Sequence, residues 1–303
     1  MIRTILEEIA QAERALRAAE ADGNERERNN LQARLAQLEA SCRDLTPEDK
    51  VMLTRLAKRP KIGQIVAHLF TDFFEQRGDR QCREDPSVLC GIALFHGRPV
   101  SVIGHRKGST IEQNIAFNFG MPGPEGYRKA LRTMQQAERF GRPILTFIDT
   151  PGAYPGLQAE ERGQSEAIAR NLAEMSQLRV PVISIVTGEG SSGGALAIGV
   201  ANQLYMLENA YYSVISPEGC ASILWKDMNQ RAQACEALRL TAQDLHALGV
   251  IDGIIPEAPG GAQRDPEALY RHLDRTILSA LAALDPLDGD ALIEHRYTKY
   301  RMM

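Results

Sequence analysis

Two glycine-rich segments, each following a short apolar run, are the parts of this sequence best suited to chemistry. Gly188-Glu-Gly-Ser-Ser-Gly-Gly194 follows the apolar run 181–187, and Asp149-Thr-Pro-Gly-Ala-Tyr-Pro-Gly156 follows the run 143–148. Because Gly193 and Gly194 lack side chains, their backbone can approach a ligand and point free N–H groups at a negative oxygen. Gly152 and Ala153 offer a second pair of amides. Two such pockets on adjacent strands would suit a reaction through an enolate; the alternative is that the glycines only permit tight turns.

The first alternative function for the segment 188–194 is dinucleotide binding. Gly188, Gly190 and Gly193 have the spacing of the dinucleotide fingerprint, and Glu208 stands twenty positions after the first glycine. The following helix, expected only at 195–200, is short for the crossover of such a unit. We therefore give this hypothesis little weight.

The second alternative is a hydrolase nucleophile. Gly190-Ser-Ser192-Gly-Gly194 fits the G-x-S-x-G pattern, and Asp244 and His246 or His272 follow in the expected order. Asp244 and His246 stand two apart on one expected helix, where side chains point in different directions. A phosphate-binding Walker loop is excluded, since no Gly-Lys-Ser/Thr occurs.

Short apolar runs alternate with helical patterns from residue 51 onward, which predicts an α/β fold. The runs 88–95 and 100–105 flank His96-Gly97-Arg98-Pro99 and predict a hairpin. Further strands are expected at 143–148, 181–187, 204–207, 211–215 and 251–255, and helices at 125–140, 159–178, 195–200, 232–248 and 266–283. Both glycine-rich segments then lie at the carboxyl ends of strands, where ligands collect in α/β folds.

The first fifty residues differ from the rest and carry most of the net charge of −4. Apolar residues recur there at helical spacing on both sides of Asp22-Gly23-Asn24, which predicts a helical hairpin. Glu7 and Glu8 interrupt the first apolar pattern, which argues against a signal peptide, because its apolar core would not contain them. No run reaches the roughly 20 apolar residues that a membrane span requires. We expect a cytoplasmic protein that does not contact a membrane.

Composition excludes further classes of protein. The chain has 303 residues, of which 44% are hydrophobic and 24% charged, as in a globular protein with a sizeable core. Its nearly neutral charge provides no basic field, so no nucleic-acid partner is expected. The five cysteines never form a CxxC pair, which argues against a disulfide framework or a zinc ribbon. We expect no metal site in this chain.

Five longer strings resemble the α-subunit family of bacterial acetyl-CoA carboxylase carboxyltransferases. They are residues 118–132, 147–156, 159–169, 188–200 and 213–226. The resemblance runs in order from about residue 31 to residue 284. It implies a crotonase-like (ClpP/crotonase) α/β fold of repeated ββα units, here with an N-terminal helical hairpin. We expect a helical arm at 1–45, a carboxyltransferase domain at 46–288 and a C-terminal tail at 289–303.

The resemblance also implies a reaction and its partners. Carboxylate would pass from carboxybiotin, tethered to the biotin carboxyl carrier protein, to acetyl-CoA, giving malonyl-CoA for the first committed step of fatty-acid synthesis. The chain would be active only with a β subunit, in an α2β2 heterotetramer that cooperates with biotin carboxylase in an ATP-dependent complex. Zinc would belong to the β subunit. The absence of any CxxC pair here agrees with α rather than β identity.

By this resemblance Gly193 and Gly194 would be catalytic, holding the biotin ureido oxygen, while the β subunit would hold the thioester enolate. Residues expected to bind substrate are Gly152, Ala153, Gly188, Gly190, Tyr154 and Arg162. His105, Arg106 and Lys107 would either meet coenzyme A phosphates or form a solvated turn.

Three positions depart from the family pattern. Ala116-Phe117 stands where a basic residue is usual, and Ser191 and Cys90 replace common glycines. These departures leave open a paralogous acyl-CoA carboxyltransferase or decarboxylase subunit of a specialised pathway.

Overall fold

The computed structural model describes residues 2–303; Met1, which begins the expected N-terminal arm, lies outside the described residues. Within these residues eight strands form one sheet. They are β1 (Thr71–Glu75), β2 (Val88–Phe95), β3 (Arg98–His105), β4 (Ile144–Thr150), β5 (Val182–Ser191), β6 (Gln203–Leu207), β7 (Tyr211–Ser213) and β8 (Gly253–Ile255).

The strands follow the order β1-β2-β3-β4-β5-β6-β8, and β7 pairs with the end of β5. β2 and β3 form the predicted antiparallel hairpin, which turns at His96 and Gly97, both with positive φ. From β3 to β8 the neighbours in this order are parallel. Every residue of β4 and β5 is buried, as expected for parallel strands covered on both faces.

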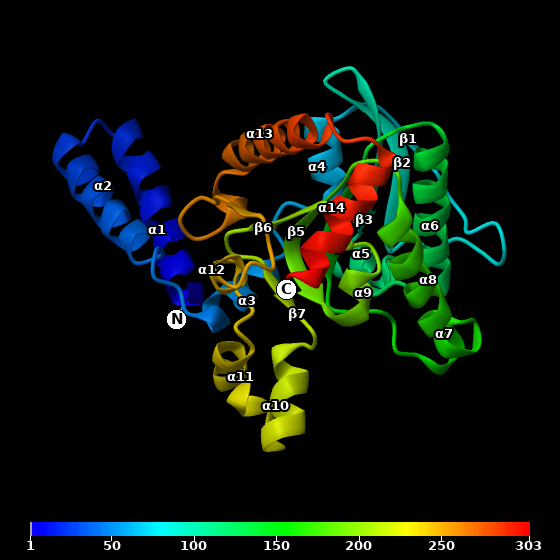
Figure 1. The fold of residues 1–303 in the computed structure, drawn as a ribbon. Helices are drawn as coiled ribbons and strands as arrows, with labels where there is room; N and C mark the ends of the chain where they lie inside the picture. The colour runs from blue at the N-terminus through cyan, green and yellow to red at the C-terminus, as the bar shows by residue number, and fades with distance from the viewer. Residues whose placement is uncertain (1) are drawn as a thin grey trace.

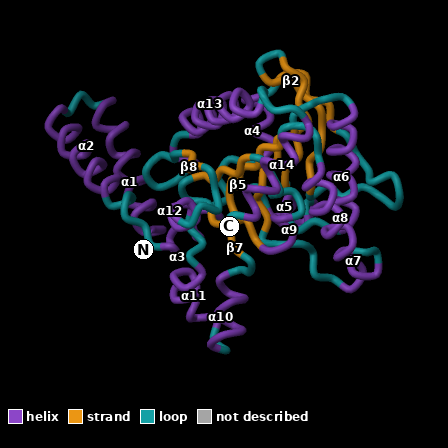
Figure 2. The backbone as a smooth tube through the Cα atoms, in the orientation of Figure 1, coloured by secondary structure: helices purple, strands orange, loops and turns teal. Residues whose placement is uncertain are grey.

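Helices lie on both faces of the sheet, as Figure 2 shows. They are α1 (Ile2–Ala21), α2 (Glu25–Ala40), α3 (Pro47–Thr54), α4 (Ile62–Leu69), α5 (Ile111–Ala116), α6 (Pro124–Arg139), α7 (Leu157–Glu161), α8 (Gln164–Gln177), α9 (Ser192–Leu196), α10 (Pro217–Trp225), α11 (Arg231–Leu238), α12 (Ala242–Ala247), α13 (Pro266–Leu284) and α14 (Gly289–Arg301), with 3-10 turns at Asn118–Gly120, Met228–Gln230 and Ala262–Arg264. α6 packs on β2, β3 and α8, whereas α13 packs on α4, β5 and β8. The expected α/β class is confirmed.

The predicted N-terminal hairpin is present as α1 and α2, which extend from one side of the molecule (Figure 1). Asn24 ends the turn between them, and its side chain accepts the Glu27 N–H at the start of α2. A separate apolar cluster that includes Ile2, Ile9 and Leu53 joins the hairpin to α3.

Two of the predicted helices are each broken in two. The stretch 159–178 forms α7 and α8, because Gly163 has a left-handed φ of 85° between them. The stretch 232–248 forms α11 and α12, because Arg239 has a φ of 47° after α11. A glycine takes this conformation freely, but an arginine does so only at a steric cost, so the second break had no signal in the sequence.

The predicted loop 188–194 and the predicted helix 195–200 are also corrected. β5 continues to Ser191, because β7 pairs in parallel with its residues Glu189, Gly190 and Ser191. The helix that follows is α9, which starts at Ser192, a residue with a φ of 57°, and ends at Leu196. The sharp turn therefore lies only at Ser192.

The C-terminal residues form a packed helix, α14, which contacts α8. Leu292 and Arg296 of this helix are buried. The division of the chain at residues 45 and 288 remains a prediction. No helix among residues 2–303 is both long enough and apolar enough to cross a bilayer.

Candidate functional site

The turns after β4 and β5 touch each other at Gly194. A Cβ atom at this position would lie 2.4 Å from the Ala153 nitrogen and 2.7 Å from the Gly152 carbonyl carbon. No real side chain tolerates such distances to backbone, so the residue must be glycine. The structure thus brings together three of the predicted residues, Gly152, Ala153 and Gly194.

The Gly152 amide is not free, contrary to the predicted second pair of donors. Its N–H donates to Thr150 Oγ1 at 3.0 Å, while Thr150 Oγ1 donates to the Gly152 carbonyl at 2.8 Å. Gly152 also has a φ of 139°, a conformation that favours glycine. Its contribution is therefore the shape of the turn that receives Gly194, and Ala153 is the remaining amide of that pair.

Gly193, unlike Gly194, has room for a side-chain atom. A Cβ atom there would meet only Ile168, at 3.6 Å. Gly193 lines a cavity of about 260 Å³ together with Ser192, Leu196, Tyr212, Ser213 and Val214. As residues of the first turn of α9, Gly193 and Gly194 have no intrahelical acceptor for their N–H groups. The geometry suits a backbone donor at the wall of a mainly apolar cavity.

Gly188 and Gly190 lie inside β5 and are buried. A Cβ at Gly188 would lie 2.4 Å from Asp149 Oδ1, and one at Gly190 would lie 2.8 Å from the Tyr212 ring. These glycines therefore allow Asp149 and Tyr212 to pack on the strand. Their role in binding substrate remains a prediction.

Tyr154 and Arg162 line another cavity, of about 380 Å³, beside the carboxylates of Asp85 and Glu125. The Tyr154 N–H donates to the Pro122 carbonyl at 2.9 Å, which ties the β4 turn to the start of α6. Arg162 Nε donates to Glu125 Oε1 at 2.5 Å, so a carboxylate already pairs with its guanidinium. Their role in binding substrate also remains a prediction.

A buried cluster of charges, absent from the sequence-based prediction, lies beneath the two turns. Lys107 Nζ donates to Asp149 Oδ1 at 2.8 Å and to Glu189 Oε2 at 2.6 Å. Arg55 Nε donates to the other oxygen of Glu189 at 2.9 Å, and Lys61 Nζ lies 4.0 Å from Asp149 Oδ2. Asp149 Oδ1 also accepts the Glu189 N–H at 3.0 Å. The ends of β4 and β5 are thereby fixed relative to each other.

Each member of the pair formed by Lys107 and Asp149 keeps the other charged. Burial opposes ionisation of Asp149, but Lys107 and Lys61 hold the pKa of this carboxyl below its usual value. Burial likewise opposes the charge of Lys107, but Asp149 and Glu189 raise the pKa of its amine. Lys107 is therefore a buried, paired cation rather than part of a solvated turn, and its amine is not free for coenzyme A phosphates.

His105 lies next to this cluster and is 1% exposed. Its Nδ1 accepts the Asp149 N–H at 3.4 Å, and the backbone of Gly194 also interacts with the imidazole and favours its protonated form. Burial lowers the pKa of His105 to about 3, although Asp149 opposes the shift. The imidazole is therefore neutral at physiological pH and does not offer a cation to a phosphate.

The alternative functions gain no support from these contacts. Among residues 2–303 no hydrogen bond joins Ser192 to Asp244, His246 or His272, and Asp244 instead accepts from Thr241 Oγ1 at 2.6 Å. The Glu208 carboxylate, expected at a ribose, accepts the Glu257 N–H at 3.0 Å. The same residues contain no cluster of three His, Cys, Asp or Glu side chains that could hold a metal ion.

Proteins of known sequence and structure resemble this chain along most of its length. The acetyl-coenzyme A carboxylase carboxyl transferase subunit alpha of Listeria monocytogenes serotype 4b is 56% identical over 272 residues, which are 89% of this chain and 86% of that protein. The protein of the same name from Geobacillus thermodenitrificans is 56% identical over 274 residues, 90% of this chain and 84% of that protein.

Among solved structures, transcarboxylase 12S matches with a TM-score of 0.60 at 21% sequence identity. The match covers 80% of this chain but only 46% of that one, so this chain spans about half the length of its structural relative. This similarity concerns the fold alone, and it confirms the crotonase-like architecture. The family model described as acetyl co-enzyme A carboxylase carboxyltransferase-like matches residues 1–303, and the chain belongs to that family.

Proposed function

We propose that this chain is the α subunit of an acetyl-CoA carboxylase carboxyltransferase and that it catalyses, with a β subunit, the carboxylation of acetyl-CoA to malonyl-CoA. The observation that carries the proposal is the contact between Gly194 and the backbone of Gly152 and Ala153 in a member of this family. The contact leaves Gly193 facing a cavity at the carboxyl end of β5. The proposal includes a CoA thioester substrate, a biotin carrier protein as carboxyl donor and a cytoplasmic location.

The cavity at Gly193 fits the group that the carrier would deliver. Gly193 is partly exposed and has room on its Cα side, and Leu196 and Val214 offer apolar walls to a fused ring system. Carboxybiotin supplies an activated carboxyl group and, after losing it, a ureido nitrogen that takes the proton from the acetyl methyl carbon. In this reaction a C–N bond breaks, a C–C bond forms, and no oxidant or reductant is needed.

The residues of this chain would act mainly by fixing backbone donors. The N–H groups of Gly193 and Gly194 would hold the ureido oxygen as negative charge develops on it. Lys107, Asp149 and Glu189 would keep the two strand ends in register through their ion pairs, with at most about a tenth of each side chain exposed. A site of this kind explains why the described residues that line the cavity include no acid/base pair.

Co-expression with the β chain of the same organism tests the proposal. The purified complex should form malonyl-CoA from carboxybiotin and acetyl-CoA, and the α chain alone should not. Propionyl-CoA and malonyl-CoA are run in parallel, because faster carboxylation of propionyl-CoA or net decarboxylation of malonyl-CoA would favour the paralogous subunit instead. An intact complex without any of these activities would contradict the proposal.

A further inference from the structure

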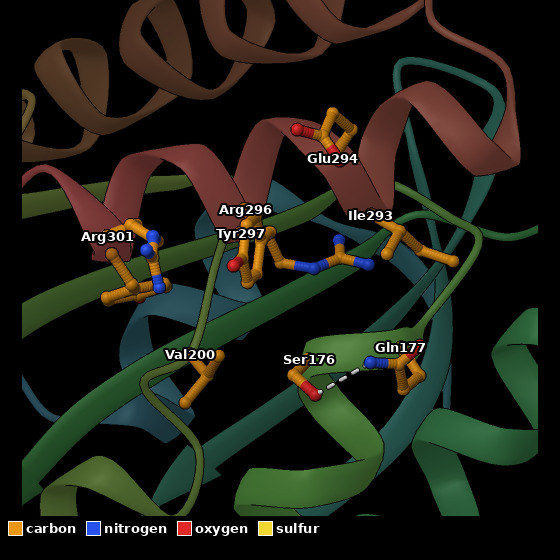
Figure 3. A pocket seen from close by; sticks show the side chains of 9 residues that line it. Ser176, Gln177, Val200, Ile293, Glu294, Arg296, Tyr297 and Arg301 are labelled. Atoms are coloured by element: carbon orange, nitrogen blue, oxygen red, sulfur yellow. Dashed lines mark hydrogen bonds between the residues drawn. The ribbon is translucent and has the colours of Figure 1, made fainter.

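The largest cavity among those described lies away from the glycine turns, between α14 and the end of α8 (Figure 3). Its volume is about 500 Å³, within the range of roughly 300–1,000 Å³ that is common for small-molecule sites. The apolar part of its wall consists of Val200, Ile293, Tyr297 and Tyr300. Ser176 and Gln177 provide polar groups on the α8 side.

Arg296 makes this cavity unusual, because its guanidinium is buried without a carboxylate. The residue is 1% exposed and reaches from α14 toward the end of α8, as Figure 3 shows. Its guanidinium donates to the carbonyl oxygens of Leu178 and Val180 and to Asn202 Oδ1. All three acceptors are neutral, and within residues 2–303 no acidic side chain forms a salt bridge with Arg296. Buried cations are ordinarily paired in a salt bridge, whereas the carboxylate of Glu138 acts on Arg296 without forming one and only raises its pKa.

The Nε–H of Arg296 is also unused. This atom is buried and has no hydrogen-bond partner among the described residues. Burial lowers the pKa of Arg296 to about 10, so the side chain still carries its charge at neutral pH. Arg296 lines the cavity, and a side-chain rotation that exposes this buried donor would let a ligand satisfy it.

The side chains that line the cavity carry one positive charge in excess, and Glu138, which acts on Arg296, lies outside the wall. Arg296 and Arg301 are cationic, and Glu294, which accepts from Thr298 Oγ1 at 3.1 Å, is the single carboxylate in the wall. A ligand with one negative charge would therefore balance the cavity. The rest of the wall is aliphatic and aromatic, so the rest of the ligand must be apolar.

We propose that the cavity between α8 and α14 binds a small amphiphilic monocarboxylate, with its carboxylate toward Arg296 and its apolar body against Val200, Ile293 and Tyr300. The site is separate from the glycine turns, but the two are connected through the chain. Tyr300 Oη accepts the Ala201 N–H at 2.9 Å and donates to the Gly199 carbonyl at 3.3 Å, in the turn that follows α9. An occupant of the cavity would thus contact the segment that begins with Gly193 and Gly194.

Calorimetric titration with decanoate tests the proposal, with 1-decanol as the uncharged probe of matched length. The full-length chain is used, in complex with its β subunit. We expect one decanoate per α chain, bound about ten to one hundred times more tightly than 1-decanol, because hydrogen bonds to charged groups contribute about 1.5–3 kcal/mol. Equal affinities, or no saturable decanoate binding, would overturn the proposal.

Variants locate the site. Ser176→Trp fills the cavity from α8 and should abolish decanoate binding, whereas Ala173→Trp, at an exposed position on the same helix outside the cavity wall, should leave it unchanged. Arg296→Met should remove the preference for decanoate over 1-decanol. Arg296 also donates to three oxygen atoms of the fold, so its replacement can disturb the structure as well as remove the charge. Arg301→Gln, at the exposed rim, is therefore the second charge variant. It should weaken the binding of decanoate several-fold and leave the binding of 1-decanol unchanged. Unchanged decanoate binding in Ser176→Trp would place the ligand elsewhere and refute the assignment.

Discussion

Replacing Gly194 by alanine should separate the two turns that meet at the carboxyl ends of β4 and β5. The added Cβ would lie 2.4 Å from the Ala153 nitrogen, and ordinary contact begins at 3.4 Å, so the turns must move apart by about 1 Å. The obstacle is backbone, which cannot rotate away as a flexible side chain would. Displacement of catalytic groups by about 1 Å costs about a hundredfold in rate, and loss of one oxyanion donor about 10²–10³. We expect kcat to fall by about 10²–10³.

Gly63→Ala, in α4 and outside the site, is the matched control. Its Cβ would meet nothing within 4 Å, and the residue does not have a positive φ, so alanine fits without strain. We expect its kcat to stay within about threefold of wild type, as for substitutions that create no clash. The assay is malonyl-CoA formation by each variant in complex with the β subunit.

A stability measurement separates displacement from unfolding. Overpacking costs about 1–3 kcal/mol, so Gly194→Ala should still fold, with a lowered urea midpoint. Retention of wild-type kcat by Gly194→Ala would refute the close contact as a requirement of the site. Equal losses of kcat in Gly194→Ala and Gly63→Ala would refute the assignment of the loss to the contact between the two turns.

Two further predictions concern the buried charges and pH. Lys107→Met leaves Asp149 and Glu189 buried with one cation fewer. It should lower the free energy of unfolding, measured by urea denaturation, by about 3–5 kcal/mol. A loss below about 1 kcal/mol would contradict a structural role for the ion pairs of Lys107. The folded state keeps His105 neutral down to about pH 3, while the unfolded chain binds that proton near pH 6.5, so stability should fall by up to about 1.4 kcal/mol per pH unit below pH 6.5. Below about pH 4 the carboxyl groups of Asp149 and Glu189, whose folded pKa values are lowered against the effect of burial, add to this loss as they become protonated. Urea midpoints between pH 7 and pH 4 check the slope, and His105→Gln should remove much of it; an unchanged slope in that variant would assign the titration to another group.

Periodicity and turn residues were sufficient to predict much of the fold. The hairpin at His96 and Gly97 and the N-terminal hairpin at Gly23 follow from local signals, because glycine provides the positive φ that each turn requires. The break at Arg239 had no such signal. The continuation of β5 to Ser191 depends on pairing with Tyr211–Ser213, a non-local contact to which a pattern of glycines gives no guide.

The candidate site was only partly predictable, for a similar reason. Glycines at the ends of adjacent strands marked where two turns would meet, and the structure places Gly194 against Ala153. The charges that fix those strand ends come from distant parts of the chain, since Arg55 and Glu189 are 134 residues apart. From the sequence alone, Arg55 and Glu189 cannot be distinguished from ordinary surface charges. Only the fold shows that they are ion-pair partners and that Glu189 is buried.

The contact of Tyr300 with the turn at Gly199 and Ala201 has a consequence for the order of synthesis. Tyr300 is synthesised about one hundred residues after the turn that it supports. A nascent chain can form β5 and α9 early, but the support behind them is completed only when Tyr300 emerges. Productive pairing with a second subunit is therefore expected only after Tyr300 has left the ribosome.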